Sequence, residues 1–182
     1  ASDVYKRQTE TSAEIEVLLK AENRDDLSLA VLLETVKRSE APLVAMALRE
    51  ARWSEFSTEV LPFILQFFKK YGSYEDAASI EELCRHHDPR VLSAAVEALE
   101  KLNPESLKPL IVPLLASPSH GIRARAIRLL HKWDPEESLR HFEASLFSED
   151  FNEKQAALFH AFFFPFSEIE PLMLRFLGME SN

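Results

Sequence analysis

The stretch DPRVLSAAVEALEKLNP, residues 88–104, decides the fold of this 182-residue chain. Val91, Ala95, Ala98, Leu99 and Leu102 lie at offsets of 0, 4, 7, 8 and 11, which is one face of an α-helix. The same stripe returns at intervals of 31 residues: first as Val60, Ile64, Phe67, Phe68 and Tyr71, then as Ile122, Ala126, Leu129, Leu130 and Trp133, and last as Glu153, Ala157, His160, Ala161 and Phe164. Among all positions of the four stripes, only Glu153 and His160 are polar. An apolar stripe that returns with such a period predicts an array of stacked helix pairs.

The residues that follow each stripe predict the start of a second helix. Asn103-Pro104 and Asp134-Pro135 come directly after two of the stripes. A short polar side chain accepts a free amide hydrogen bond at a helix start, and the first turn has no use for the N–H that proline lacks. The helix pairs then cover residues 57–86, 88–117, 119–147 and 150–178, after a looser pair and a single helix near residues 12–22. Pro62, Pro109, Pro113 and Pro171 lie inside predicted helices and are expected to bend them.

Composition supports an all-α fold and restricts the class of partner. With 3 Gly in the chain, few positions suit the tight turns of β-hairpins. The formal net charge of −9 opposes binding of nucleic acid over the whole surface, because phosphate contacts need a basic surface. The apolar runs are far shorter than the about 20 residues of a membrane span. We therefore expect neither a nucleic acid nor a membrane as partner.

The single cysteine, Cys84, indicates a reducing compartment, which we take to be the cytoplasm. One thiol cannot form an internal disulfide, and Cys84 lies in line with Ala77, Ile80 and Leu83 on a predicted helix. Nothing around the thiol predicts a lowered pKa, so we interpret it as a small buried apolar side chain.

The ends of the chain are set apart from the repeats. Residues 2–8 read SDVYKRQ, which looks like the in-frame translation of a transposon end used to prepare sequencing libraries. We interpret residues 1–8 as an artefact or a disordered tail on a fragment of a longer, bacterial-like gene of environmental origin. Residues 12–178 then form a single solenoid domain, and residues 179–182 a second tail.

The stripe and its flanking residues resemble HEAT repeats, whose first helix often begins D-P-x-V-R with a small-residue pair one turn later. The residues that carry the resemblance are Asp88, Pro89, Arg90, Val91, Ala94 and Ala95, then Ile122, Arg123 and Ala126, then Lys154, Ala156 and Ala157. The resemblance covers about residues 26–178 and implies a right-handed α-solenoid of about five HEAT-like helix pairs plus an N-terminal half-repeat. It also implies a ladder of Asp and Arg between repeats, which is interrupted where Leu92 replaces a basic residue. Tetratricopeptide repeats are the alternative fold, but their period is 34 residues.

This resemblance implies a protein–protein interaction scaffold or a regulatory module with no catalysis of its own. We expect no catalytic residue, no cofactor and no metal site. His86, His87 and His120 are interpreted as loop residues, because adjacent side chains at a helix start point in different directions. A HEAT-like enzyme is the alternative function, either DNA glycosylase-like or bilin lyase-like. Trp133 and Asp134 superficially fit a glycosylase pocket, but we interpret them as a stripe residue and a helix cap.

The predicted partner-binding surface lies on the second helices, which line the concave side of HEAT arrays. Lys108, Arg140, His141 and Arg175 lie beside the apolar stripes of these helices. Their positive charge on an acidic chain favours an acidic protein segment as the partner. The second candidate surface is the run FFFPF at residues 162–166, where some of the rings must meet another element.

Overall fold

The computed structural model describes the backbone of residues 2–21 and 25–180 and the side chains of residues 11–21 and 25–178. Within this part, the chain forms eleven α-helices and three 3-10 helices, and no strand. The all-α class predicted from the sequence is confirmed. The helices gather into two compact parts, which we call the N-terminal unit (residues 1–107) and the C-terminal unit (residues 108–182). The single domain over residues 12–178 stays a prediction, and the predicted tails include residues 1, 181 and 182, which lie outside the described residues.

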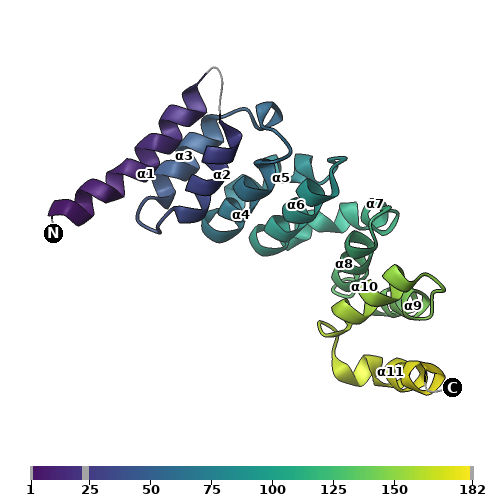
Figure 1. Ribbon diagram of the computed structural model, residues 1–182. Coiled ribbons are helices and arrows are strands. Elements are labelled where there is room, and N and C mark those ends of the chain that lie inside the picture. The colour runs from purple at the N-terminus through teal and green to yellow at the C-terminus, as the bar shows by residue number, and fades with distance from the viewer. Residues whose placement is uncertain (1, 22–24, 181–182) are drawn as a thin grey trace. The chain divides into compact units, whose positions relative to one another are not determined.

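The N-terminal unit is a sequence of helices that pack on their neighbours (Figure 1). Its elements are α1 (Ser2–Lys20), α2 (Asp26–Thr35), α3 (Ala41–Glu50), η1 (Trp53–Glu55), α4 (Leu61–Tyr71), η2 (Tyr74–Asp76), α5 (Ala77–Leu83) and α6 (Pro89–Leu102). The helix α1 packs on α2 and α3, α4 packs on α2, α3 and α6, and α5 packs on α6. First helices therefore contact first helices, as the period predicts.

The C-terminal unit repeats this arrangement (Figure 1). After η3 (Pro104–Leu110) come α7 (Ile111–Leu115), α8 (His120–Leu130), α9 (Pro135–Leu146), α10 (Phe151–Ala161) and α11 (Phe166–Glu180). The helix α8 packs on α7, α9 and α10, and α9 also contacts α10 and α11. In chain order, the two units hold the five predicted helix pairs after the single helix α1.

The stripe that repeats every 31 residues forms the core of both units. All of its positions are buried or half-buried. In one column, Ile64, Ala95 and Ala126 are 0% exposed and Ala157 is 2% exposed. The polar exception Glu153 also lies inside the packing, since its side chain is 12% exposed.

Polar caps and prolines set the helix starts. Asp88 and Asp134 accept a backbone hydrogen bond in the first turn of α6 and α9, which confirms their interpretation as caps. The expectation that Pro62 bends a helix is wrong, because α4 begins at Leu61 and Pro62 lies in its first turn. Pro109 lies in η3, so the predicted second helix of residues 88–117 is divided into η3 and the short α7.

Candidate interaction groove

A groove in the N-terminal unit is lined by positively charged side chains. It has a volume of about 740 Å³ and lies beside α3 and the end of α4. Its lining residues are Arg38, Ala41, Pro42, Ala45, Arg49, Lys70, Tyr71 and Gly72. Arg38, Arg49 and Lys70 are positively charged and no lining residue is acidic, although the chain has a net charge of −9. The groove is thus a basic surface on an acidic chain.

Gly72 shapes the groove where α4 ends. Its backbone N–H donates to the carbonyl oxygen of Phe68 at 2.7 Å, which closes the last turn of the helix. A Cβ atom on Gly72 would lie 2.5 Å from the same oxygen and 3.1 Å from Oδ2 of Asp76. Only glycine allows this close approach without a shift of the backbone, so the residue fixes the path from α4 into η2.

Two side chains hold the walls of the groove in place. The Tyr71 hydroxyl donates to the backbone oxygen of Val36 at 2.9 Å and ties the end of α4 to the segment that follows α2. Arg49 donates through Nε and Nη2 to the two carboxylate oxygens of Asp76, at 2.6 and 2.9 Å. Because the side chain of Asp76 is 2% exposed, this bidentate pair fixes Arg49 on α3.

The pair with Asp76 decides how much free positive charge the groove carries. Burial by itself would raise the pKa of Asp76, but hydrogen bonds from Arg49 and from the Ser73 amide outweigh burial and lower the pKa below its ordinary value of 3.8. Asp76 is therefore ionised at neutral pH and neutralises Arg49. Arg38 and Lys70 form no ion pair within residues 11–21 and 25–178, so they supply the uncompensated charge.

A smaller apolar pocket adjoins the basic groove. Its volume is about 200 Å³, and it shares Lys70 and Tyr71 with the groove. Its remaining lining residues are Leu33, Glu34, Pro62, Phe63, Gln66 and Phe67. The basic groove and the apolar pocket together can receive a peptide segment in which acidic side chains lie next to an apolar side chain.

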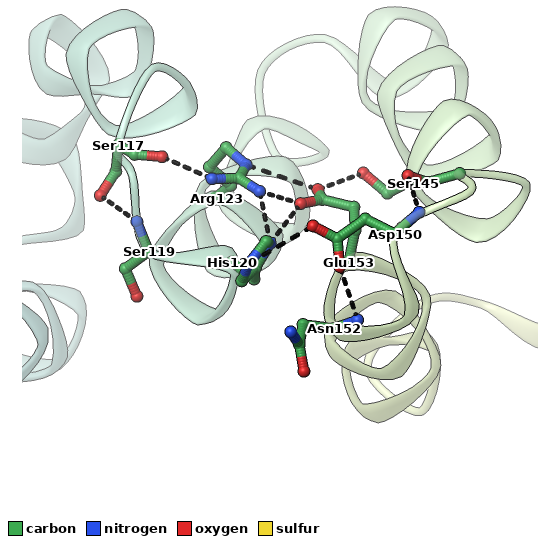
Figure 2. A network of polar contacts seen from close by, with 9 residues as sticks. Ser117, Ser119, His120, Arg123, Ser145, Asp150, Asn152 and Glu153 are labelled. Carbon is green, nitrogen blue, oxygen red and sulfur yellow. Dashed lines mark hydrogen bonds and ion pairs between the residues drawn. The ribbon is translucent and has the colours of Figure 1, made fainter.

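A network of polar contacts lies elsewhere, between α8 and α10 of the C-terminal unit. Figure 2 shows Arg123, His120 and Ser145 directed toward the carboxylate of Glu153. Arg123 forms an ion pair with Glu153 and donates to the backbone oxygen of Ser117 at 2.7 Å. Nδ1 of His120 lies 2.8 Å from the Glu153 carboxylate, and the Ser145 hydroxyl donates to it at 3.0 Å. The network therefore joins two consecutive helix pairs.

The charges in this network compensate one another. Burial would raise the pKa of Glu153, but the hydrogen bonds from Arg123, His120 and Ser145 outweigh burial and lower the pKa below its ordinary value of 4.5. The pair of Arg123 and Glu153 links two consecutive helix pairs, but its acid is a stripe residue and not the Asp at a helix start that the ladder of the family resemblance implies. In the N-terminal unit, Arg90 contacts Glu59, which lies 31 residues before it, and Asp88.

The predicted partner-binding residues all lie in the C-terminal unit, outside the groove. The four residues are Lys108, Arg140, His141 and Arg175. All are exposed except His141, which is half-buried. Arg140 and His141 both pair with Glu137, and Arg175 pairs with Glu143. These acids weaken the positive charge of the predicted surface, and its role in binding stays a prediction.

Sequence reasoning did not find the basic groove. Arg38 and Arg49 belong to the loosest helix pair, where the stripe is too weak to predict which side chains meet. The sequence nevertheless contained one indication of the groove. The pairs of basic residues at 37–38 and 69–70 lie about one period apart. Side chains one period apart lie on neighbouring helix pairs, so these two pairs could have been placed together.

The histidines weighed as metal ligands have local contacts. Nδ1 of His86 accepts a hydrogen bond from the backbone N–H of Asp88 at 3.0 Å, and the rings of His86 and His87 stack with centroids 4.4 Å apart. His120 belongs to the network around Glu153. In the part of the chain that the structure describes, no group of three or more His, Cys, Asp or Glu is placed to hold a metal ion.

The structure also shows the surroundings of three other residues that the sequence analysis discussed. Asp134 accepts a hydrogen bond from the backbone N–H of Glu137 at the start of α9, and Trp133 is half-buried before it. Cys84 is 6% exposed, and burial raises the pKa of its thiol to about 12. The interpretation of Cys84 as a buried apolar side chain is therefore confirmed.

Comparisons with known proteins agree with the repeat architecture. Of the helices within the described residues, none combines the length and apolar character needed to cross a membrane. No curated protein and no solved structure matches the chain. The family model for HEAT repeats matches residues 75–161, which run from η2 to the end of α10 and include the stretch 88–104. Residues 75–161 of this helical-repeat protein are therefore HEAT repeats.

Proposed function

We propose that this chain is a protein-interaction module with no catalysis of its own, and that its basic groove binds an acidic segment of a partner protein. HEAT repeats commonly bind proteins. The observation that carries the proposal is the lining of the groove, which includes the free charges of Arg38 and Lys70 and no acid, on a chain with a net charge of −9. An acidic segment is repelled by most of such a chain and attracted where cations gather, which directs it to this groove.

The size of the groove favours a short segment over an extended polyanion. Its volume of about 740 Å³ lies within the usual range of ligand pockets. Arg38 and Lys70 offer two positive charges, and the adjoining pocket offers Leu33 and Phe63 to an apolar side chain. We therefore expect the bound segment to carry an apolar residue next to several Glu or Asp residues.

The test measures binding of a short fluorescein-labelled peptide rich in Glu and Leu by fluorescence anisotropy. The double variant Arg38→Glu/Lys70→Glu reverses the free charges of the groove and leaves the pair between Arg49 and Asp76 intact. We expect this variant to bind the peptide at least about tenfold more weakly, and added salt to weaken binding to the unsubstituted chain.

The matched control is Lys108→Glu/Arg140→Glu, which reverses the same number of charges on the surface predicted from the sequence. Unchanged binding in this control, with a helical circular dichroism spectrum in both variants, supports the groove as the site. Loss of binding in the control alone would assign the peptide to the other surface. If the unsubstituted chain does not bind the peptide saturably, the proposal is wrong.

A further inference from the structure

One apolar column that is buried in three helix pairs is exposed in the fourth. Leu65, Val96, Ile127 and Leu158 follow one another at intervals of 31 residues, on α4, α6, α8 and α10. Their exposed fractions are 0%, 1%, 4% and 38%. The apolar side chain at this position is therefore buried on α4, α6 and α8 and exposed to solvent on α10.

The packing within each unit shows what covers this column. The helix α6 packs on α4, and α10 packs on α8. Ile127 belongs to one buried cluster with Ala157 and Ala161, which are residues of α10. Small apolar residues of the following first helix thus lie against the column and let the two helices approach closely. On α6, the residue equivalent to Ala157 is Ala95, which is 0% exposed.

The residues beside the column also contact the following helix pair. Gln66 and Lys69 of α4 donate to Glu97 of α6, at 3.3 and 2.8 Å. The guanidinium of Arg128, on α8, lies 5.0 Å from the centroid of the Phe163 ring. This side of α4 and of α8 is therefore the side that meets the next pair within the same unit.

On α10 the same side is apolar and exposed. The positions of Gln66 and Lys69 are taken on α10 and directly after it by Phe159 and Phe162, which are 71% and 90% exposed. Phe151 is 73% exposed and shares this side of the helix. We call Phe151, Leu158, Phe159 and Phe162 the end face. Clustered apolar side chains on a surface mark an interaction site.

We infer that the end face binds an amphipathic α-helix of a partner protein, seated as α6 is on α4 and α10 is on α8. The inferred interface repeats the packing of α6 on α4 and of α10 on α8. The bound helix carries alanine at the centre of its stripe, because Ala95 and Ala157 occupy that position in α6 and α10. It is apolar where α6 has Glu97, because Phe159 and Phe162 offer neither the amide nor the ammonium that Glu97 meets on α4.

A second copy of the chain fits the end face less well than such a helix. Two end faces that meet would bring only large side chains together, because none of the four residues of the end face is small. The helices of the two copies could then not approach as closely as α8 and α10 do. This inference concerns the C-terminal unit and does not rest on the basic groove of the N-terminal unit.

The test uses a fluorescein-labelled peptide of residues 88–102 that carries Glu97→Leu and a staple on its exposed side, since an unsupported helix of this length is marginal in water. We expect saturable binding to the full chain. The double variant Leu158→Asp/Phe159→Asp should bind at least about tenfold more weakly, and a peptide that also carries Ala95→Asp should not bind. The matched control is Val112→Asp, at a residue of α7 that is 76% exposed, and it should bind as the unsubstituted chain does.

Phe159 and Val112 are largely exposed and Leu158 is partly exposed, so each variant should stay folded. The thermal melting temperature of each variant, measured beside its binding, separates lost binding from lost folding. The inference is wrong if the unsubstituted chain does not bind the peptide or if Leu158→Asp/Phe159→Asp binds it equally well. It is also wrong if sedimentation shows a dimer of the chain that this double variant dissociates, because the end face is then occupied by a second copy.

Discussion

The absence of a Cβ atom at Gly72 determines how the backbone leaves α4. A Cβ atom at Gly72 would lie 2.5 Å from the carbonyl oxygen of Phe68, and a backbone atom cannot move aside as a flexible side chain does. We expect Gly72→Ala to lower the free energy of unfolding by about 1–3 kcal/mol, the usual effect of overpacking. Urea denaturation followed by far-ultraviolet circular dichroism measures this change.

Gly121 provides the control for this prediction. It lies in the first turn of α8, and a Cβ atom there would meet no heavy atom within 4 Å. Gly121→Ala should therefore raise the free energy of unfolding by about 0.4–1 kcal/mol, because alanine restricts the unfolded chain. Equal stabilities for the two alanine variants would contradict the assignment of Gly72 as a position of close approach.

The carboxylate of Asp76 makes the stability of the fold depend on acid. Its pKa in the folded chain lies below the ordinary value of 3.8, so the unfolded chain takes up the proton more readily. The stability that Asp76 contributes is complete above that ordinary value and is lost as the pH falls through the folded pKa. We expect the free energy of unfolding of Asp76→Asn to be smaller at neutral pH and to fall less steeply between about pH 5 and about pH 2.

Urea denaturation at a series of pH values tests this prediction, and Arg49→Met is its companion variant. Without the guanidinium, only the hydrogen bonds from Ser73 oppose the effect of burial, so the pKa of Asp76 should rise and its contribution to the acid dependence should shrink. If Asp76→Asn and the unsubstituted chain gave parallel curves, Asp76 would not be the group responsible.

At the scale of the helices, the sequence was sufficient to predict a helix and its buried face where most stripe positions are apolar. The helix α6 spans Pro89–Leu102, with the cap Asp88 and the stripe that the stretch 88–104 predicts. Apolar residues at five positions of one helical face leave a single way to bury that face, so periodicity predicts both the helix and its core. The prediction of helix pairs and of Cys84 as a core residue followed from this spacing.

The sequence was insufficient to predict which side chains are buried or meet where contacts between different helices decide this. The run 162–166 illustrates this, because Phe164 is 6% exposed whereas Phe163 and Phe166 are 56% and 67% exposed. Spacing indicated that some of these rings must be buried, but not which. The basic groove was missed for the same reason, since Arg38 and Lys70 come from different helix pairs and meet only when those pairs pack.

At the scale of the whole molecule, the packing of the helices divides at residue 107. This division predicts where a local defect spreads. Ala126 is 0% exposed on α8, so Ala126→Asp places a carboxylate without a partner in the core of the C-terminal unit. An uncompensated buried charge costs about 3–5 kcal/mol, which should open that unit. Ala144→Asp, at an exposed residue of α9, is the control and should have little effect.

Hydrogen exchange followed by mass spectrometry shows how far the Ala126→Asp defect extends. We expect the amides of α8, α9 and α10 to lose protection while those of α4 and α6 keep theirs, because the core of the N-terminal unit is formed within residues 1–107. The opposite variant, Ile64→Asp on α4, should expose the N-terminal unit and leave α8 and α10 protected. Loss of protection in both units of either variant would instead mean that the helix pairs unfold together, as the single domain predicted over residues 12–178 requires.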